Sequence, residues 1–264
     1  MMLISNELNF KIVGRGYPVV FLHGFLESIS MWDYIQIEKF PFQSILIDLP
    51  GHGKSLNEDD NEPSIDFMAE KVLGLLSKLE ICIFSIVGHS MGGYVALEVK
   101  NKSLKAENSI IECQKVVLLN SNFWIDNDSK KNDRLRVAEI VFKNKELFLN
   151  TAIPNLFNEP TRYRNQISKL LNEALLLDEH AIAYSSLAMR NRKDLSSLVT
   201  SFDSDFLIIQ GEEDSIVPKE VMEEFISNLN VEYCLLKKSG HMAHIQSSEF
   251  VRDVICDFIL KGKV

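Results

Sequence analysis

Short apolar runs alternate along the chain with segments whose apolar residues recur at helical spacing. Residues 19–22 (VVFL) and 45–47 (ILI) are apolar, β-branched and followed by loops containing Gly or Pro, which is typical of buried strands. Residues 64–79 instead repeat apolar side chains every three or four positions, and Ser64 is a candidate N-cap, so they predict a helix. Further strands are predicted at 82–87, 116–119, 206–209 and 233–236, and further helices from about Met91 and over 247–260. This alternation predicts an α/β fold with a mostly parallel central sheet flanked by helices on both faces.

The alternation stops between residues 121 and 200. Helices are expected there over 133–148, 161–177 and 179–189, and the segment lacks a clear strand pattern. We therefore predict a helical insertion between two late strands. The chain is divided into a first core part (1–120), the insertion (121–200) and a second core part (201–264).

Composition narrows the classes of function. The chain has 46% hydrophobic and 25% charged residues, as ordinary soluble proteins do, and a net charge of -9, which argues against a nucleic-acid or anionic-membrane partner. We recognise no signal peptide, which would show a basic segment followed by an apolar one, and no apolar stretch long enough for a transmembrane helix. A cytoplasmic location is therefore expected. The four cysteines show no metal-ligand spacing, so buried free thiols and no metal are expected. A phosphate-binding loop ending in residues 53–55 would need Gly at position 48, which is Asp, so no nucleotide cofactor is expected.

Residues 88–92 (GHSMG) place a serine between glycines where a predicted strand meets a predicted helix. A serine at so tight a turn projects above the sheet at a helix N-terminus, where developing negative charge is favoured. Ser90 is therefore a candidate nucleophile, and a serine needs a base and an orienting acid.

The last two strand ends supply candidates for the base and the acid. His241 follows Gly240 after the last strand, and His244, three residues later, competes for the same role. Asp214 lies in a Gly-initiated loop after the penultimate strand, where open α/β sheets place functional groups. The order Ser90, Asp214, His241 then falls at three strand ends.

At this point the chain resembles the α/β-hydrolase family over essentially its whole length. The matching motifs are residues 22–25 (LHGF), 48–55 (DLPGHGKS), 88–93 (GHSMGG), 211–214 (GEED) and 240–241 (GH). The resemblance implies Ser90 as nucleophile, Asp214 as acid, His241 as base, and the backbone N–H groups of Phe25 and Met91 as the oxyanion hole. It also makes the insertion a cap above the nucleophile, while three other histidines are read as structural: His23, His52 and His89.

The substrate pocket is expected to be apolar, with Phe25 and Met91 in its wall. Trp124, Phe142 and Met189 of the insertion are further candidates, although they could equally form the core of the cap. The arginines of the insertion, which are Arg134, Arg136, Arg162, Arg164, Arg190 and Arg192, are expected to be largely solvated.

The leading interpretation is a serine hydrolase that cleaves a carboxylic ester of a small, partly apolar substrate without a cofactor. Enzymes that cleave thioesters, lactones and other acyl or carbon–carbon bonds use the same triad, so the type of bond cleaved stays open. A lyase similar to the synthase of succinyl-cyclohexadiene carboxylate is an alternative, although Tyr94 stands where that enzyme is expected to carry an arginine. A ligand receptor with a hydrolase fold is the other alternative. Whether the protein is a monomer or a homodimer stays open.

Overall fold

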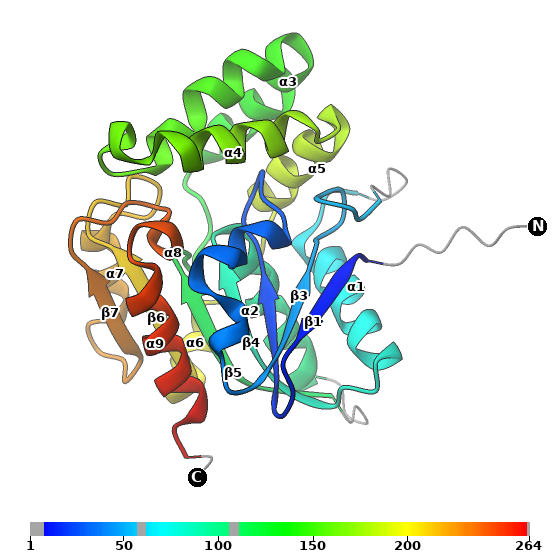
Figure 1. Cartoon of the computed structure of the whole chain (residues 1–264), viewed down its shortest axis with the longest axis vertical. Helices are drawn as coiled ribbons and strands as arrows, with labels where there is room; N and C mark the ends of the chain where they lie inside the picture. Colours follow the sequence, from blue (N-terminus) through cyan, green and yellow to red (C-terminus); the bar gives the residue numbers. More distant parts are fainter. Residues whose placement is uncertain (1–7, 57–61, 106–110, 263–264) are drawn as a thin grey trace, which may run out of the picture.

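The computed structural model describes residues 8–56, 62–105 and 111–262, and its centre is a seven-stranded sheet (Figure 1). The strands lie in the order β1-β3-β2-β4-β5-β6-β7. Every neighbouring pair is parallel except β1 and β3, which are antiparallel. The strands are β1 (Phe10–Val13), β2 (Pro18–Leu22), β3 (Gln43–Ile47), β4 (Ile83–His89), β5 (Glu112–Leu119), β6 (Phe206–Gly211) and β7 (Glu232–Leu236). The predicted α/β fold with a mostly parallel sheet is confirmed.

Side chains alternate between two apolar cores, one on each face of the sheet, because successive residues of a strand point in opposite directions. In β2, Val20 and Leu22 face one cluster, and Val19 and Phe21 face the other. The first cluster is covered by α1 (Ile65–Lys78), α2 (Met91–Lys105), α6 (Ser196–Ser201) and α7 (Lys219–Ile226). The second is covered by α9 (Ser248–Leu260), the short α8 (Ala243–Gln246) and the 3-10 helices η1 (Ile29–Ile35) and η2 (Ile37–Lys39).

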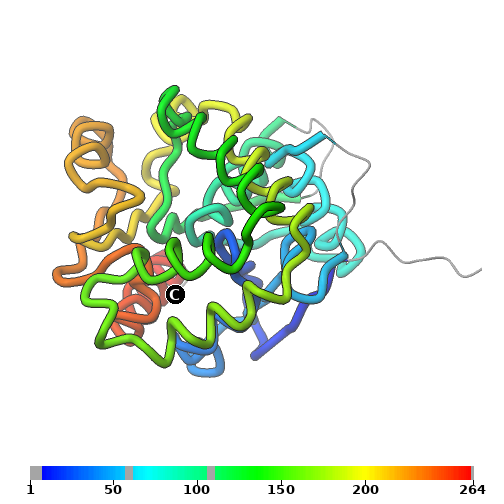
Figure 2. The backbone as a smooth tube through the Cα atoms, turned by 90° about the horizontal axis from the view of Figure 1, so that it is seen from above, coloured from blue at the N-terminus to red at the C-terminus, as the bar shows by residue number. Residues whose placement is uncertain are grey.

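Between β5 and β6 the chain leaves the sheet and forms three long helices above the carboxyl ends of the strands (Figure 1). These are α3 (Asp128–Ala152), α4 (Arg164–Leu175) and α5 (Glu179–Arg190), called the cap below, with η3 (Pro154–Leu156) and η4 (Pro160–Tyr163) between the first two. Seen from above, they spread across the strand ends (Figure 2). A third apolar cluster joins them to Leu26 and Met242, which belong to loops of the sheet.

Side chains from the segment between β5 and β6 also pack into one of the two cores of the sheet. Tyr184 and Met189 of α5 and Leu198 of α6 pack into the cluster on the α2 face of the sheet. The division at residues 120/121 and 200/201 therefore remains a prediction.

Sequence patterns missed the edge strand β1. It has only four residues, and Phe10 and Ile12 are exposed by 37% and 42%, so its alternation carries no buried face. Helix α1 agrees closely with the prediction, and the Ser64 side chain caps it by accepting a hydrogen bond from the Phe67 N–H. No helix within the described residues is long and apolar enough to cross a membrane.

Candidate active site

Ser90 lies in a tight turn between β4 and α2. Its φ is +48°, a left-handed conformation that residues with side chains seldom adopt. A Cβ atom on Gly88 would overlap the carbonyl oxygen of Gly92, and one on Gly92 would lie 2.5 Å from the carbonyl oxygen of His23. The turn therefore closes only with glycine at both positions, which is the steric reason for the pattern around Ser90.

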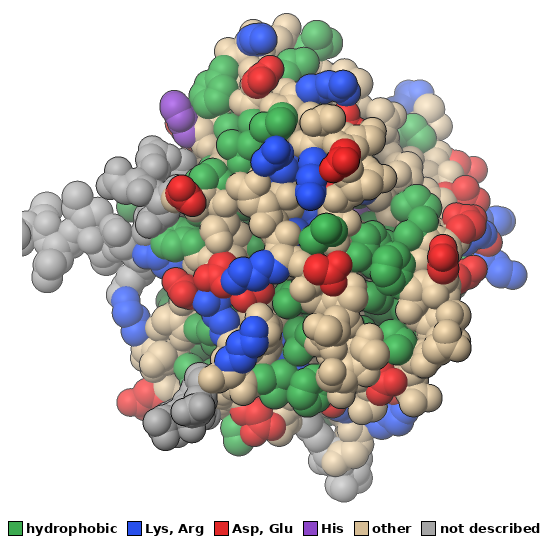
Figure 3. Space-filling view, turned by 180° about the vertical axis from the view of Figure 1, so that it is seen from behind, with side chains coloured by type: hydrophobic (Ala, Val, Ile, Leu, Met, Phe, Trp, Pro, Cys, Tyr) green, Lys and Arg blue, Asp and Glu red, His purple; other side chains and the backbone are tan. Residues whose placement is uncertain are grey.

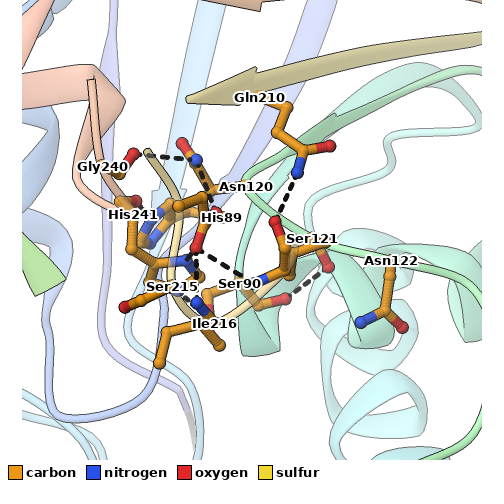
Figure 4. Close-up of polar contacts among 12 residues, drawn as sticks. His89, Ser90, Asn120, Ser121, Asn122, Gln210, Ser215, Ile216, Gly240 and His241 are labelled. Carbon is orange, nitrogen blue, oxygen red and sulfur yellow. Dashed lines mark hydrogen bonds and ion pairs between the residues drawn. The ribbon is translucent and has the colours of Figure 1, made fainter. Parts of the chain in front are cut away.

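The structure brings together the three residues that the sequence singled out, two of which, Ser90 and His241, are labelled in Figure 4. His241 Nε2 lies 2.9 Å from Ser90 Oγ, and His241 Nδ1 lies 2.9 and 3.0 Å from the two carboxylate oxygens of Asp214. Asp214 follows β6 and His241 follows β7, and both are nearly buried, at 5% and 3% exposure. Ser90 is partly exposed.

Asp214 is surrounded by hydrogen-bond donors. Asn120 donates its amide to Asp214 Oδ2 at 2.8 Å, and the N–H groups of Ile216 and Val217 donate to Oδ1 at 2.8 and 3.0 Å. Burial raises the pKa of the Asp214 carboxyl, but the charge and hydrogen bond of His241 and the donors from Asn120 and Val217 outweigh it and lower the pKa overall. The carboxylate therefore stays ionised.

An ionised Asp214 determines the tautomer of His241. A carboxylate only accepts hydrogen bonds, so Nδ1 of His241 carries the proton and donates to Asp214. Nε2 then presents its lone pair to the Ser90 hydroxyl, which donates to it. This arrangement can take the proton of Ser90 when its oxygen attacks an electrophile.

The two predicted oxyanion donors belong to neighbouring segments. Met91 is the first residue of α2, and the first N–H groups of a helix have no acceptor within it. Phe25 follows Gly24 after β2, and the end of β2 touches the serine turn, since a Cβ on Gly92 would overlap the carbonyl of Leu22. The fold thus places the loop that carries Phe25 beside the serine turn.

A buried ion pair that the sequence did not reveal lies behind the serine. Glu27 Oε2 is 3.0 Å from His89 Nδ1 and accepts the Gly24 N–H at 2.6 Å, while His89 Nε2 lies 3.0 Å from the carbonyl oxygen of His241. Burial raises the pKa of Glu27, but the charge and hydrogen bond of His89 outweigh it and lower that pKa to about 2. Burial likewise lowers the pKa of His89, yet Glu27 raises it overall. Because the Glu27 carboxylate and the His241 carbonyl only accept hydrogen bonds, His89 donates from both ring nitrogens, as an imidazolium does.

Burial lowers the pKa of three further histidines near the serine. His244, the alternative base, is fully buried against the rings of Trp32 and His89, and burial lowers its pKa well below the ordinary value. Burial also lowers the pKa of His23, and lowers that of His52 to about 3. His23 and His52 contact backbone groups of the loops beside the serine.

Three of the predicted pocket residues lie near the serine turn or in the core beneath the cap. Phe25 is half-buried and lies between the sheet cluster and the cap cluster. Met91 and Met189 are almost completely buried in the sheet cluster. The two methionines therefore fill core space, and Phe25 alone of the three is partly open.

Trp124 and Phe142 differ in their surroundings. Trp124 stacks on Phe225 of α7, with ring centres 4.3 Å apart, at one wall of a groove of about 650 Å³ between the start of the cap and the loop after Asp214. Phe142 is 52% exposed and its ring contacts the exposed His180, so the expectation that it faces the pocket is corrected: it lies on the solvent side of α3. Figure 3 shows apolar side chains gathered near the middle of the molecule's rear face, among charged ones.

Arg192 also departs from its expected solvation. Its guanidinium is buried and donates to Asp126 Oδ1 and to the carbonyl oxygen of Trp124, both at 2.8 Å, and lies 4.2 Å from the centre of the Tyr94 ring. Burial raises the pKa of Asp126, but Arg192 outweighs it and lowers that pKa. Arg192 thus joins the two ends of the cap to the first turn of α2.

Among the residues that the structure describes, no group of three or more His, Cys, Asp or Glu side chains is placed to hold a metal ion. Cys113 is buried and the other three cysteines, Cys82, Cys234 and Cys256, are only partly buried; all four are free thiols.

Comparison with known proteins agrees with the fold described above. The family model described as "alpha/beta hydrolase fold" matches residues 17–248. A thermophilic esterase from Thermogutta terrifontis superimposes with a TM-score of 0.86 at 27% identity, over 96% of this chain and 93% of that one. The acetyltransferase component of the acetoin cleaving system of Pseudomonas putida is 26% identical over 96% of this chain, which spans only 66% of that protein. A putative 2-succinyl-6-hydroxy-2,4-cyclohexadiene-1-carboxylate synthase of Haemophilus influenzae is 25% identical over 92% of this chain and 97% of its own length.

Proposed function

The chain belongs to the alpha/beta hydrolase fold family, and we propose that it is a serine hydrolase acting on a carboxylic ester or related acyl bond of a small, partly apolar molecule. The observation that carries the proposal is the continuous line of hydrogen bonds from Ser90 Oγ through His241 to Asp214. The likeness to an esterase at 27% identity supports the same reaction class.

In the proposed reaction, Ser90 Oγ attacks the carbonyl carbon as its proton passes to Nε2 of His241. Asp214 stabilises the imidazolium that forms, because its carboxylate is ionised and faces Nδ1. The carbonyl oxygen becomes negative, and the N–H groups of Phe25 and Met91 bind it. His241 then protonates the departing alcohol, which leaves an acyl group on Ser90.

Water completes the cycle. His241, neutral again, takes a proton from a water molecule that attacks the acyl-enzyme, and a second oxyanion forms in the same place. When it collapses, the acid departs and Ser90 recovers its proton from His241. The chemistry uses only groups of this chain and water.

A second candidate, the carbon–carbon lyase, has one observation in its favour besides its relative. Arg192 brings a cation to the ring of Tyr94, in the first turn of α2, where such an enzyme is expected to hold an arginine for substrate carboxylates. Asp126 neutralises that cation, however, at 2.8 Å. Since the charge is already paired, the hydrolase is the stronger proposal.

The test is intact-mass spectrometry after exposure to a fluorophosphonate, which reacts with activated serines. We expect one adduct, mapped to Ser90, that is lost in Ser90→Ala and in His241→Ala. Ser215→Ala is the matched control, because Ser215 is an exposed serine beside Asp214 whose hydroxyl donates to the carbonyl of Asn155 at 3.3 Å and takes no part in the line from Ser90 to Asp214.

An adduct that persists in Ser90→Ala would refute the assignment of the nucleophile. With the adduct established, short p-nitrophenyl esters, thioesters, lactones and the dicarboxylate substrate of the lyase are compared. Turnover of the dicarboxylate without ester cleavage would replace the hydrolase by the lyase. Ligand-dependent thermal shifts without any turnover would favour a receptor.

A further inference from the structure

Each N–H group proposed to bind the oxyanion belongs to a peptide unit whose other end is the carbonyl of the preceding residue. The N–H of Met91 shares its plane with the carbonyl of Ser90, and the N–H of Phe25 shares its plane with the carbonyl of Gly24. Because a trans peptide is rigid, a group that holds the carbonyl also fixes where the N–H points.

The carbonyl of Ser90 is held by a buried side chain. Ser121 is 1% exposed, and its Oγ lies 2.7 Å from the Ser90 carbonyl oxygen (Figure 4). A carbonyl oxygen can only accept, so the Ser121 hydroxyl donates its proton there. The Gly93 N–H also donates to this oxygen, at 3.0 Å, which gives it two donors from two different segments.

The position of Ser121 is fixed as closely as its hydrogen bond. A Cβ on Gly93 would lie 2.5 Å from Ser121 Cβ and would overlap its Oγ, so glycine at 93 leaves the space that Ser121 occupies. Ser121 follows β5, whereas Ser90 follows β4, and the Ser90 N–H donates to Leu119 O at 3.0 Å. Ser90 is therefore hydrogen-bonded to the end of β5 and the residues after it through both its N–H and its carbonyl.

The second oxyanion peptide is held in the same way. His23 Nε2 accepts the Leu49 N–H at 2.9 Å, so in the neutral ring the proton sits on Nδ1, which donates to the Gly24 carbonyl at 2.8 Å. Each of the two peptide units thus receives a hydrogen bond on its carbonyl from a buried side chain. The recurrence at both donors argues that this support belongs to the oxyanion hole.

We propose that Ser121 is a positioning residue of the oxyanion hole: its hydroxyl orients and polarises the Ser90–Met91 peptide so that the Met91 N–H points at the developing oxyanion. The inference rests on the proposed serine-hydrolase function. A hydrogen bond to a carbonyl strengthens the donor at the other end of the same peptide, and a fixed donor needs no reorientation during the reaction. Ser121 itself does not touch the substrate.

The variant Ser121→Ala removes only the hydroxyl, and Ser44→Ala is the matched control, since Ser44 is also fully buried but lies in β3. Turnover of p-nitrophenyl butyrate is measured for both, together with inhibition by an alkyl trifluoromethyl ketone. The ketone forms a hemiketal with Ser90 whose oxygen, like the transition state, is negative. Removing a whole donor costs about 10²–10³ in rate, so misdirecting one that is still present is expected to cost about ten-fold.

For Ser121→Ala we expect kcat to fall about ten-fold with KM nearly unchanged, and the affinity for the ketone to fall by the same factor. The pH profile of kcat should keep its position, because the triad is intact. Ser44→Ala should leave all three unchanged. Wild-type kcat and ketone affinity in folded Ser121→Ala, or a loss accompanied by a shifted pH profile, would overturn the proposal. If Ser121→Ala does not fold, Ser121→Cys, with a weaker donor in the same place, gives the same comparison. Failure of the wild-type protein to react with a fluorophosphonate would instead refute the proposed function.

Discussion

The buried pair of Glu27 and His89 gives a prediction about stability that can be worked out from the structure. Glu27 is 3% exposed and His89 1%, and their charged atoms lie 3.0 Å apart. The variant Glu27→Gln keeps the size and shape of the side chain but removes its charge. It leaves the imidazolium of His89 buried without a counter-charge.

The magnitude follows from the pKa of Glu27. It falls from an ordinary value of 4.5 to about 2, because the attraction of His89 exceeds the cost of burial. A difference of about 2.5 pH units corresponds to a stabilisation on the order of 3 kcal/mol. Removing one partner of a buried ion pair costs about 3–5 kcal/mol in other proteins, which agrees.

The pair also fixes how this stabilisation depends on pH. The pKa of Glu27 is lowered on folding, so its contribution is complete above about pH 4.5 and is lost as the pH falls toward 2. The pKa of His89 is raised above its ordinary 6.5, so the same interaction is lost as the pH rises through that raised value. The stabilising effect is therefore greatest between pH 4.5 and 6.5.

Urea unfolding at pH 6 and at pH 3 measures the effect. At pH 6 we expect Glu27→Gln to lose about 3 kcal/mol, or roughly 6–12 °C in Tm, and by pH 3 the gap should shrink to less than half. Glu98→Gln is the matched control: Glu98 is 4% exposed, but burial raises its pKa, so neutralising it should cost little or stabilise. Equal stabilities of Glu27→Gln and wild type at pH 6 would refute the ion pair and leave His89 neutral.

Two further predictions concern charges around the site. In Asp214→Asn the amide no longer holds the proton of His241 on Nδ1, so we expect kcat to fall by about 10⁴ while the fold is retained. Esterase assays measure the first and circular dichroism the second. Near-normal turnover would exclude Asp214 as the acid. Arg192→Met leaves the Asp126 carboxylate buried beside a single weaker partner, so we expect thermal unfolding to show a loss of about 3 kcal/mol, whereas the exposed Arg136→Met should change stability by less than about 0.5 kcal/mol. Similar small losses of stability in both arginine variants would mean that the two ends of the cap do not depend on the pair of Arg192 and Asp126.

The sheet and the three central residues could be predicted from sequence because their signals are local. Each strand is a short apolar run, and Ser90, Asp214 and His241 each follow a glycine within three residues at a strand end. Parallel strands bring their carboxyl ends to one edge, so residues far apart in the chain were expected to meet. The choice between His241 and His244 depended on the direction of one turn, which the sequence does not encode locally.

The supporting residues could not be predicted in this way. Asn120, Ser121 and Glu27 are ordinary polar residues in loops, and Asn120 and Glu27 meet their partners across 94 and 62 positions of sequence. Their function appears only when their neighbours are known. The prediction that Phe142 lines the pocket was wrong for a related reason. Which face of a cap helix points inward depends on packing, and α3 is interrupted at Asn144, which has a non-helical backbone.

Three of the seven non-glycine residues with positive φ among the described residues belong to the serine turn and the loops after β2 and β5. These are Ser90, Asn120 and Leu26, and the charges of Glu27 and His89 are buried nearby, since His89 precedes Ser90 and Glu27 follows Leu26. Each such backbone conformation costs about 1–3 kcal/mol and persists only where the surrounding structure over-determines it. Here the hydrogen bonds of Asn120, His89 and the strand ends supply that restraint.

A site held in this way is organised before any substrate arrives. Its residues lie at or after the ends of β2, β4, β5, β6 and β7, which all belong to one sheet. The cap contacts this frame through Arg192, through the cluster around Met242 and through the Leu156 carbonyl of η3, which accepts the His241 N–H at 2.9 Å, but no cap side chain belongs to the line from Ser90 to Asp214. Variants of the frame should therefore change kcat, and variants of the inner cap surface should change KM and the choice of substrate. That separation means that the chemistry of Ser90 can be established with simple esters before the natural substrate is known.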